Sequence, residues 1–355
     1  MQYEVKKGFV SLPKGCYIQL EKKASEVILA NIRRSFGDRA GLIARIETFT
    51  QDSGLPLSLK NFISYYHLDP RSIYGKFSFS RLCAAAGVLD DFAEPAESIL
   101  TKAFSKLVSV DSRRWIKFLT DILPRFSCEL AASLSDFEKR MLQMFYITVF
   151  QEAADWRSHT TQANMQLLAD SPIMMHELNE LLSFNLERID FIDQPVPLGF
   201  DCPLDLHCTY TRDQILIAMD YMTPKNVREG VKWLPDKQVN VFFITLNKAD
   251  KDYSPTTMYN DYSINESLFH WQSQSTTSDT ASTGQRYINH RQRGSKVVLF
   301  VREFKQDSIG AAPYTCLGTA AYVKHTGSKP MNITWHLDQP IPAKYLRKTN
   351  KLVVG

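Results

Sequence analysis

Hydrophobic and polar positions along this chain change their spacing near residue 195. Before that point, apolar residues recur every three or four positions, which is the period of an amphipathic helix. Ser58 and Ser135 stand where helix N-caps are expected, and Ser135-Asp-Phe-Glu138 has the pattern of a capping box. Helices are predicted over 25–34, from Ser58, from Asp69-Pro70, over 137–154 and over 174–188. We therefore expect residues 1–195 to form a helical bundle.

After residue 195 the pattern favours strands. The prolines within 193–203 cannot continue a helix, so we expect this segment to link two domains. Residues 275–284 hold few apolar side chains and are interpreted as a flexible loop. One helix is predicted over 211–219, and strands are predicted over 240–246, 296–302, 314–323 and 331–337. The predicted fold class is α+β, with domains over 1–195 and 205–355.

The stretch 258–275 combines aromatic and polar side chains at high density. A packed core does not need that mixture, because buried polar groups without partners cost free energy. A pocket for an extruded nucleobase does need it, since rings stack on the base and polar groups bind its edge. The alternative is a strand and loop with aromatics in the core and amides capping turns. The candidate base-pocket residues are Tyr259, Asp261, Tyr262, His270, Trp271, Gln272, Ser273 and Gln274.

The chain has a formal net charge of +4, and its basic excess lies in residues 201–355. Part of this excess surrounds a predicted turn at Gly294, a pattern that suits contact with phosphate groups. A solvated hairpin tip explains the same cluster. The candidate DNA-backbone residues are Arg286, His290, Arg291, Arg293 and Lys296.

Composition and short motifs exclude several classes of protein. A chain of 355 residues with 44% hydrophobic residues suits two globular domains. No apolar run approaches the roughly 20 residues that span a bilayer, and the first residues do not resemble a signal peptide, so we expect a cytoplasmic protein without membrane contact. Cys202 and Cys208 lack the second pair of a zinc site, so the cysteines are expected to be structural thiols. No phosphate-binding glycine loop is present, and we expect no metal, no cofactor and no nucleotide hydrolysis by this chain alone.

An ordered series of longer motifs runs along the chain: Asn247-Lys-Ala-Asp-Lys-Asp-Tyr-Ser-Pro, Phe269-His-Trp-Gln-Ser-Gln-Ser, Thr283-Gly-Gln-Arg-Tyr-Ile-Asn-His, Val298-Leu-Phe-Val-Arg-Glu and Gly327-Ser-Lys-Pro-Met. The series resembles the C-terminal domain of a bacterial family of helicase-linked proteins. The upstream segment Leu12-Pro-Lys-Gly-Cys-Tyr-Ile-Gln-Leu-Glu-Lys resembles the region that follows the second motor lobe in those proteins. Some members are SauUSI-like type IV restriction enzymes, which are modification-dependent.

The resemblance implies a role in recognition. SauUSI-like enzymes join a phospholipase-D-type nuclease, a DEAD-like helicase, a helical coupling region and a target-recognition domain, and they cut DNA containing 5-methylcytosine or 5-hydroxymethylcytosine with the use of ATP. Residues 1–195 would then be a coupling domain that starts at the tail of the motor, and 205–355 an SRA/PUA-like twisted β-barrel. The nuclease and helicase would belong to the same parent polypeptide, so this fragment is expected to be non-catalytic. Its expected partner is double-stranded DNA with a modified cytosine.

The resemblance also suggests roles for individual residues. In SRA domains a Tyr and an Asp begin the pocket, and an aromatic residue further along the chain stacks on the base. Tyr259 and Asp261 match the first pair, and His270 or Trp271 matches the stacking position. Asp261 would accept from the cytosine N4 amine, and a backbone amide or Gln272 would donate to O2. A methyl group in an apolar wall adds only about 1 kcal/mol, so we expect modest discrimination.

Three other functions remain open on sequence. Glu303-Phe-Lys305 follows an apolar strand, as in metal-dependent nucleases, although a solvated strand end explains it equally. The helical half can serve as a structural module that forms oligomers of the parent motor, and a homodimer is possible. A PUA-like pocket can also bind modified RNA, because the contacts that separate RNA from DNA are not visible in a sequence.

Overall fold

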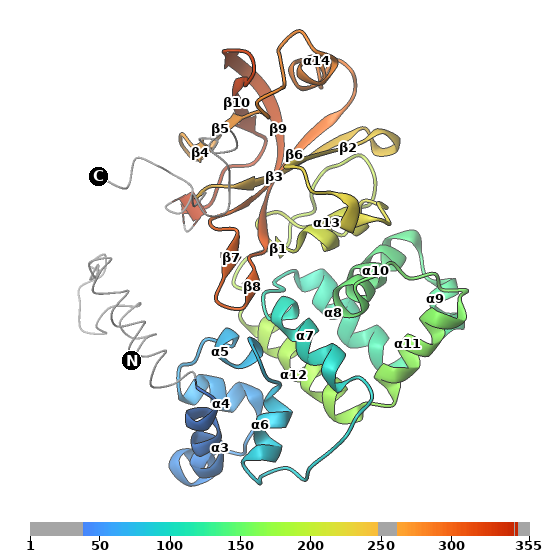
Figure 1. Ribbon diagram of the computed structural model, residues 1–355, viewed down its shortest axis with the longest axis vertical. Helices are drawn as coiled ribbons and strands as arrows, with labels where there is room; N and C mark the ends of the chain where they lie inside the picture. Colours follow the sequence, from blue (N-terminus) through green and yellow to red (C-terminus); the bar gives the residue numbers. More distant parts are fainter. Residues whose placement is uncertain (1–37, 248–260, 344, 347–355) are drawn as a thin grey trace, which may run out of the picture. The chain divides into compact units, whose positions relative to one another are not determined.

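The computed structural model describes residues 38–247, 261–343 and 345–346 (Figure 1). Contacts divide the chain into two compact units, each made of two separate stretches. We call the unit of residues 1–108 and 163–184 the helical unit. The unit of residues 109–162 and 185–355 is called the sheet unit. This arrangement interleaves the two units along the chain, whereas the sequence led us to expect one boundary near residue 195.

The described part of the helical unit consists of helices and connecting loops. Ser58 caps α4, since its side chain accepts a hydrogen bond from the Asn61 N–H at 3.2 Å, which confirms the predicted start of that helix. The short helix expected from Asp69-Pro70 is also present. The helices are α3 (Arg39–Ser53), α4 (Leu59–Tyr65), α5 (Arg71–Tyr74), α6 (Phe79–Ala85), α7 (Glu97–Leu107) and most of α11 (His159–Ala169) and α12 (Pro172–Glu187). The helix predicted over 25–34 lies outside the described residues.

A buried carboxylate organises the core of the helical unit. Glu177 on α12 accepts hydrogen bonds from the N–H groups of Phe79 and Ser80, at 2.6 and 2.8 Å. These N–H groups open α6 and have no partner within the helix, so the carboxylate satisfies them. Burial raises the pKa of Glu177, and the hydrogen bonds oppose that rise. Glu177 therefore serves packing and helix capping.

The sheet unit begins with its own helices: α8 (Arg113–Ile122), the short η1 (Leu123–Arg125), α9 (Cys128–Ser133) and α10 (Asp136–Phe150). The predicted capping box at Ser135 is confirmed, because Ser135 and Glu138 bond to each other's backbone N–H groups. α10 ends at Phe150, four residues before the predicted end, where Gln151 takes a left-handed conformation with φ 63°. A later helix, α13 (Arg212–Ala218), lies within the predicted range 211–219 and is capped by Thr211.

Polar contacts join α8 and α10 to the segment that precedes the sheet. Arg114 lies 2.6 Å from the fully buried Asp205, whose other carboxylate oxygen accepts from Ser112 at 2.7 Å. Arg140 on α10 donates two hydrogen bonds to Asp220, at 2.8 and 2.9 Å. These pairs explain why α8 to α10 belong to the sheet unit. The expected linker at 193–203 contains no helix, and Pro195 forms an isolated β-bridge with Asp205.

The sheet contains eight strands in the order β2-β3-β6-β9-β10-β5-β4, with β1 paired to β9 outside that path. β3 and β6 are parallel and the other pairs are antiparallel, so the sheet is mixed. A separate hairpin joins β7 (Gln306–Asp307) and β8 (Gly310–Ala311). The strands are β1 (Thr209–Tyr210), β2 (Val231–Leu234), β3 (Val239–Thr245), β4 (Tyr262–Ser263), β5 (Leu268–Gln272), β6 (Lys296–Arg302), β9 (Tyr314–Thr326) and β10 (Asn332–Leu337). The α+β class and the four predicted strands are confirmed.

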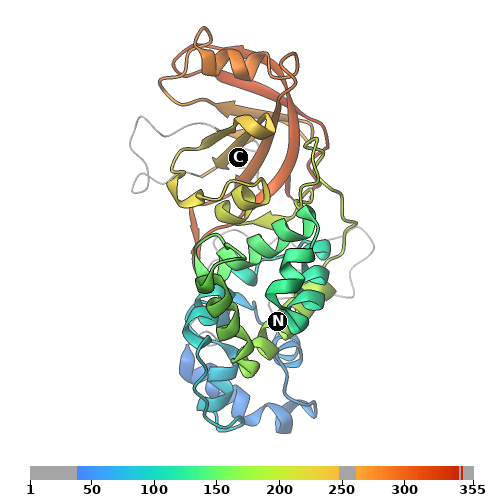
Figure 2. The ribbon, with the colours of Figure 1, turned by 90° about the vertical axis from the view of Figure 1, so that its right-hand side faces the viewer.

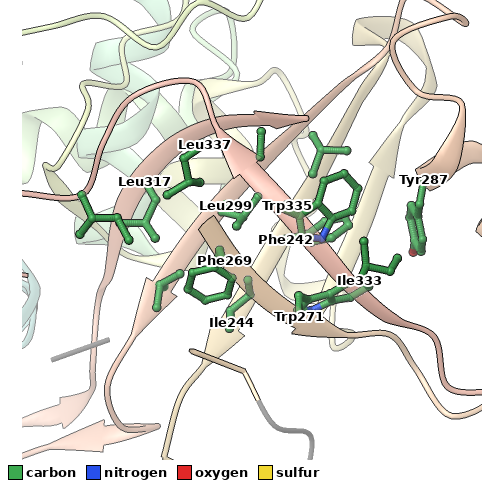
Figure 3. Packing of buried hydrophobic residues seen from close by; sticks show 14 of the residues in the cluster. Phe242, Ile244, Phe269, Trp271, Tyr287, Leu299, Leu317, Ile333, Trp335 and Leu337 are labelled. Atoms are coloured by element: carbon green, nitrogen blue, oxygen red, sulfur yellow. The ribbon is translucent and has the colours of Figure 1, made fainter. Parts of the chain in front are cut away.

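The sheet curls tightly although it does not close. Neighbouring strands lie about 4.8 Å apart, so β3 and β5, with three strands between them, would be roughly 19 Å apart in a flat sheet. The ring centres of Phe242 on β3 and Trp271 on β5 are instead 4.3 Å apart, and Trp335 on β10 lies 5.6 Å from Phe242 (Figure 3). The described strands form an open path from β2 to β4. A closed barrel, which we expected from sequence, is therefore not observed.

The segment predicted as a flexible loop is folded back on the sheet unit. Its last residues, 282–284, begin α14 (Ser282–Ile288), which lies beside the strands in both views (Figure 1, Figure 2). Thr277 and Ser278 are buried, and the Thr277 carbonyl accepts from the Lys329 N–H at 3.1 Å. A Cβ at Gly284 would lie 2.0 Å from the Ser278 carbonyl oxygen. Glycine is needed here because the loop passes directly over the helix.

Candidate nucleic-acid interface

The aromatic stretch forms the β4–β5 hairpin. The Asn265 side chain closes its turn by accepting from the N–H groups of Ser267 and Leu268, at 2.9 and 2.8 Å. Tyr262 pairs directly with His270 in the antiparallel register. Because successive residues of a strand face opposite sides of a sheet, this hairpin divides the candidate residues between two faces. Tyr259 lies outside the described residues.

One face of β5 belongs to the hydrophobic core. Trp271 is 5% exposed and packs against Phe242 and against Tyr287, whose ring centre is 5.6 Å away (Figure 3). Phe269 is fully buried in the same cluster. An indole enclosed by three elements has no exposed face for a base. The burial of Trp271 favours the packing alternative that the sequence left open, so we leave it out of the proposed pocket.

The opposite face of the hairpin presents a stacked pair of rings. Tyr262 and His270 are both half-buried, with ring centres 4.8 Å apart and an angle of 16° between the ring planes. Cross-strand partners in an antiparallel pair lie close enough for this contact. Each ring covers one face of the other, so the pair is partly exposed only on its outward side. It is the best candidate for base stacking among the residues predicted from sequence.

The polar candidates lie at the end of the same hairpin. Asp261 is 5% exposed, and one of its carboxylate oxygens accepts from the Gln272 N–H at 2.9 Å. Gln272 itself is half-buried. Ser273 is fully buried, and its hydroxyl accepts from the Met331 N–H at 2.9 Å. Gln274 closes a turn, since its carbonyl accepts from the Thr277 N–H at 2.9 Å. Asp261, Ser273 and Gln274 are therefore held by local hydrogen bonds, and Asp261 and Gln272 are the neighbours of the ring pair along the two strands.

His290 does not lie on the surface. The side chain is 2% exposed, its Nε2 accepts from the Tyr322 N–H at 3.2 Å, and its Nδ1 lies 3.1 Å from the Ser295 carbonyl oxygen. The contact with the carbonyl oxygen requires a proton on Nδ1, so the neutral ring is the tautomer protonated at Nδ1. Burial lowers the pKa of His290, and the hydrogen bond to Ser295 opposes that shift. A phosphate contact does not fit this position, and the turn around Gly294 explains the residue instead.

The other basic candidates differ in their surroundings. Arg291 is well exposed and forms an ion pair of 2.9 Å with Asp338. Lys296 donates to the Pro197 carbonyl oxygen. Arg293 is exposed, with no ion pair among the described residues. Arg286 is half-buried and donates from Nε to Asn240 at 2.8 Å. Arg286 differs from them in that aromatic rings as well as a hydrogen bond hold its guanidinium.

The rival metal site gains no support. The described residues include no group of three or more His, Cys, Asp or Glu side chains able to hold a metal ion. Glu303 is exposed just after β6. Cys83, Cys202, Cys208 and Cys316 are buried free thiols, and burial raises the pKa of Cys202 to about 12. These thiols are neutral at physiological pH, which agrees with the structural role expected for them. None of the described helices is long and apolar enough to cross a membrane.

Comparison with known proteins identifies one family in part of the chain. Residues 204–348 match a domain of unknown function, DUF3427. The matched region runs from Leu204 through the whole described sheet, including the β4–β5 hairpin and α14, but it covers less than half of the chain. No curated protein matches the chain.

Proposed function

We propose that this chain is a DNA-binding target-recognition module of an ATP-dependent, modification-dependent restriction enzyme of the SauUSI-like type, and that it binds an extruded 5-methylcytosine or 5-hydroxymethylcytosine. The chain itself is non-catalytic in this proposal, and the nuclease and helicase belong to the parent polypeptide. The observation that carries the proposal is the stacked pair of Tyr262 and His270, beside the buried carboxylate of Asp261. The match to DUF3427 agrees with the resemblance to helicase-linked proteins without defining a function.

The architecture of the sheet supports an SRA/PUA-like relationship. Folds of this kind hold a flipped base against a small, strongly curved sheet. The contact between Phe242 on β3 and Trp271 on β5 indicates that this sheet is strongly curved, although the path of strands stays open. In such a site the ring pair supplies the stacking surface, and stacking on an aromatic ring contributes about 1–3 kcal/mol per base.

Polar groups beside the ring pair would select cytosine. The carboxylate of Asp261 accepts a hydrogen bond from the Gln272 N–H, and in this proposal it would also accept from the N4 amine of cytosine. Gln272, half-buried at the end of β5, would donate to O2. A base extruded from the helix costs a few kcal/mol, and contacts with phosphate groups offset that cost.

The proposal is tested by binding of the full chain to one duplex that carries C, 5-methylcytosine or 5-hydroxymethylcytosine at a single site, at fixed salt. We expect tighter binding of one or both modified duplexes, by roughly fivefold if a methyl contact adds about 1 kcal/mol. His270→Ala and Asp261→Asn should reduce this preference and leave the affinity for the unmodified duplex within about twofold. Equal affinity for all three duplexes would contradict the proposal. Tighter binding of a matched RNA would instead support a PUA-like RNA-binding function.

A further inference from the structure

Arg286 is held in a fixed orientation by two neighbouring strands. Its Nε donates to Oδ1 of Asn240 at 2.8 Å. Its guanidinium carbon lies 4.9 Å from the ring centre of Trp233 and 5.6 Å from that of Tyr287. A hydrogen bond at Nε together with stacking on an indole fixes both the direction and the plane of the guanidinium.

The two residues that hold Arg286 are brought together by the sheet. Trp233 on β2 and Asn240 on β3 are direct partners in the antiparallel register, so their side chains share one face. Asn240 is fully buried, and its Nδ2 lies 3.5 Å from the Lys296 carbonyl oxygen, which fixes Oδ1 toward Arg286. Trp233 is half-buried. Neither residue was a candidate on sequence, because Arg286 lies far along the chain from both.

The guanidinium retains unused hydrogen-bonding capacity. Asn240 occupies the Nε donor, and the phenol of Tyr287 interacts with the same side chain. A guanidinium has more N–H donors than these two partners can accept. Arg286 is half-buried and makes no ion pair with a described carboxylate, in contrast with Arg291, which pairs with Asp338. The terminal nitrogens are therefore available to an anionic ligand from outside the chain.

We propose that Arg286 is a preorganised phosphate-binding residue, positioned by Asn240 and Trp233, and that its ligand is a phosphodiester group of the nucleic-acid backbone. The planar guanidinium matches two phosphate oxygens at once, which a lysine ammonium cannot do. Because the side chain is already ordered, binding loses less conformational entropy than at a mobile arginine. The choice of nucleic acid as the polymer rests on the proposed function, but the contact does not depend on cytosine modification.

Binding of the unmodified duplex to the full chain provides the main test. Arg286→Gln should weaken this binding roughly tenfold. Arg286→Lys should weaken it nearly as much, because an ammonium group can neither stack on Trp233 nor bind two phosphate oxygens in the way a planar guanidinium does. Arg228→Gln is the matched control, since it removes the same charge from an exposed side chain outside the candidate DNA-backbone residues, and we expect a loss of less than twofold. The slope of log K against log salt should fall by about 0.9 for Arg286→Gln, as expected when one phosphate contact is removed.

The positioning residues need a different measurement. Trp233→Leu should weaken binding of the same duplex and shift the Nε–H resonance of Arg286 in the free protein, whereas Trp233→Phe should restore most of the affinity. A destabilised fold would instead lower the melting temperature without a selective change in the Arg286 resonance. Equal effects of Arg286→Gln and Arg228→Gln, or full activity of Arg286→Lys in duplex binding, would overturn the proposal.

The outcomes separate this inference from the proposed function. The chain could bind duplexes with C, 5-methylcytosine and 5-hydroxymethylcytosine equally well, with every affinity dependent on Arg286. This result would contradict the proposed recognition of modified cytosine and leave the phosphate contact intact. A titration with pyrophosphate covers the case in which no duplex binds. If pyrophosphate then shifts the Arg286 Nε–H resonance, the ligand is a free phosphate compound and the nucleic-acid assignment is overturned. The absence of both duplex binding and a shift overturns the phosphate site altogether.

Discussion

At the scale of single residues, neighbours in the sequence have opposite roles. His270 is half-buried and stacks on Tyr262, whereas the next residue, Trp271, is buried in the hydrophobic core. The sequence showed that this stretch was rich in rings, and the alternation of a strand implied that about half of them would face inward. Which rings face inward depends on the pairing of β5 with β10. β10 lies about 60 residues further along the chain, so the sequence around β5 does not indicate this pairing.

Trp271→Ala is expected to act on stability. Removing a fully packed indole typically costs about 3–5 kcal/mol, so the variant should unfold at much lower denaturant concentration. Leu268→Ala, on the half-buried face of the same strand, is the control and should cost clearly less. Chemical unfolding of both variants checks this. A Trp271→Ala protein with unchanged stability and a selective loss of binding to modified DNA would restore Trp271 to the pocket.

His290 should make the stability of the chain depend on pH. Burial lowers its pKa in the folded state, so below the usual imidazole pKa of about 6.5 the unfolded chain binds the proton more readily. The contribution of His290 is complete above that pH and is lost as pH falls toward the folded pKa. Arg291 nearby favours this shift and Asp338 opposes it.

The measurement is the unfolding midpoint of the wild type and of His290→Phe between pH 8 and pH 5.5. The wild type should lose more stability on acidification than the variant, because only the wild type must take up this proton. Parallel pH profiles would show that His290 is not responsible.

At the scale of elements, local signals were the most informative. The capping box at Ser135 and the cap at Ser58 were recognised because they depend on residues within one helical turn. β6 was predicted at its observed bounds, since alternation and β-branched residues are also local. The first residues of α14, 282–284, were interpreted as the end of a loop, because their Ser and Thr side chains resemble a linker and the burial of Tyr287 depends on the distant sheet. Packing against the distant sheet therefore determines that this segment is helical.

Gly284→Ala tests the packing of this element. The added Cβ would lie 2.0 Å from the Ser278 carbonyl oxygen and 3.0 Å from the Met331 sulfur, so the 275–281 segment must move. We expect a loss of stability of about 1–3 kcal/mol, as for other overpacked sites. Ser282→Ala, at the exposed first residue of α14, should change stability by less than about 0.5 kcal/mol. Thermal unfolding distinguishes the two, and equal midpoints would contradict the close packing at Gly284.

At the scale of the whole molecule, the two compact units are not the two halves of the sequence. α8 to α10 precede the proline-rich segment, yet they belong to the sheet unit through pairs such as Arg114 with Asp205 and Arg140 with Asp220. Burial alone raises the pKa of Asp220, but Arg140 and Lys237 outweigh it and lower the pKa overall. The sequence predicted the change from helices to strands, because the spacing of apolar residues changes at that point. It could not predict these contacts, which join residues about 80 or more positions apart.

Hydrogen exchange of the full chain tests this division. Helices α8 and α10 should lose protection together with β6 and β9, because a compact unit opens cooperatively. Helices α3 to α7 should open in a separate step of different free energy. Exchange of α10 in step with α7, and not with the sheet, would contradict the assignment of α10 to the sheet unit.

The central claim is that a modified cytosine leaves the double helix and stacks on Tyr262 and His270. The most direct measurement is the fluorescence of a 2-aminopurine placed next to a single 5-methylcytosine, since this probe brightens when its neighbour leaves the stack. We predict that the full chain raises the fluorescence of the methylated duplex more than that of the unmethylated one, and that Tyr262→Ala with His270→Ala removes the difference while binding persists. Binding of the methylated duplex with no rise in fluorescence would contradict the account.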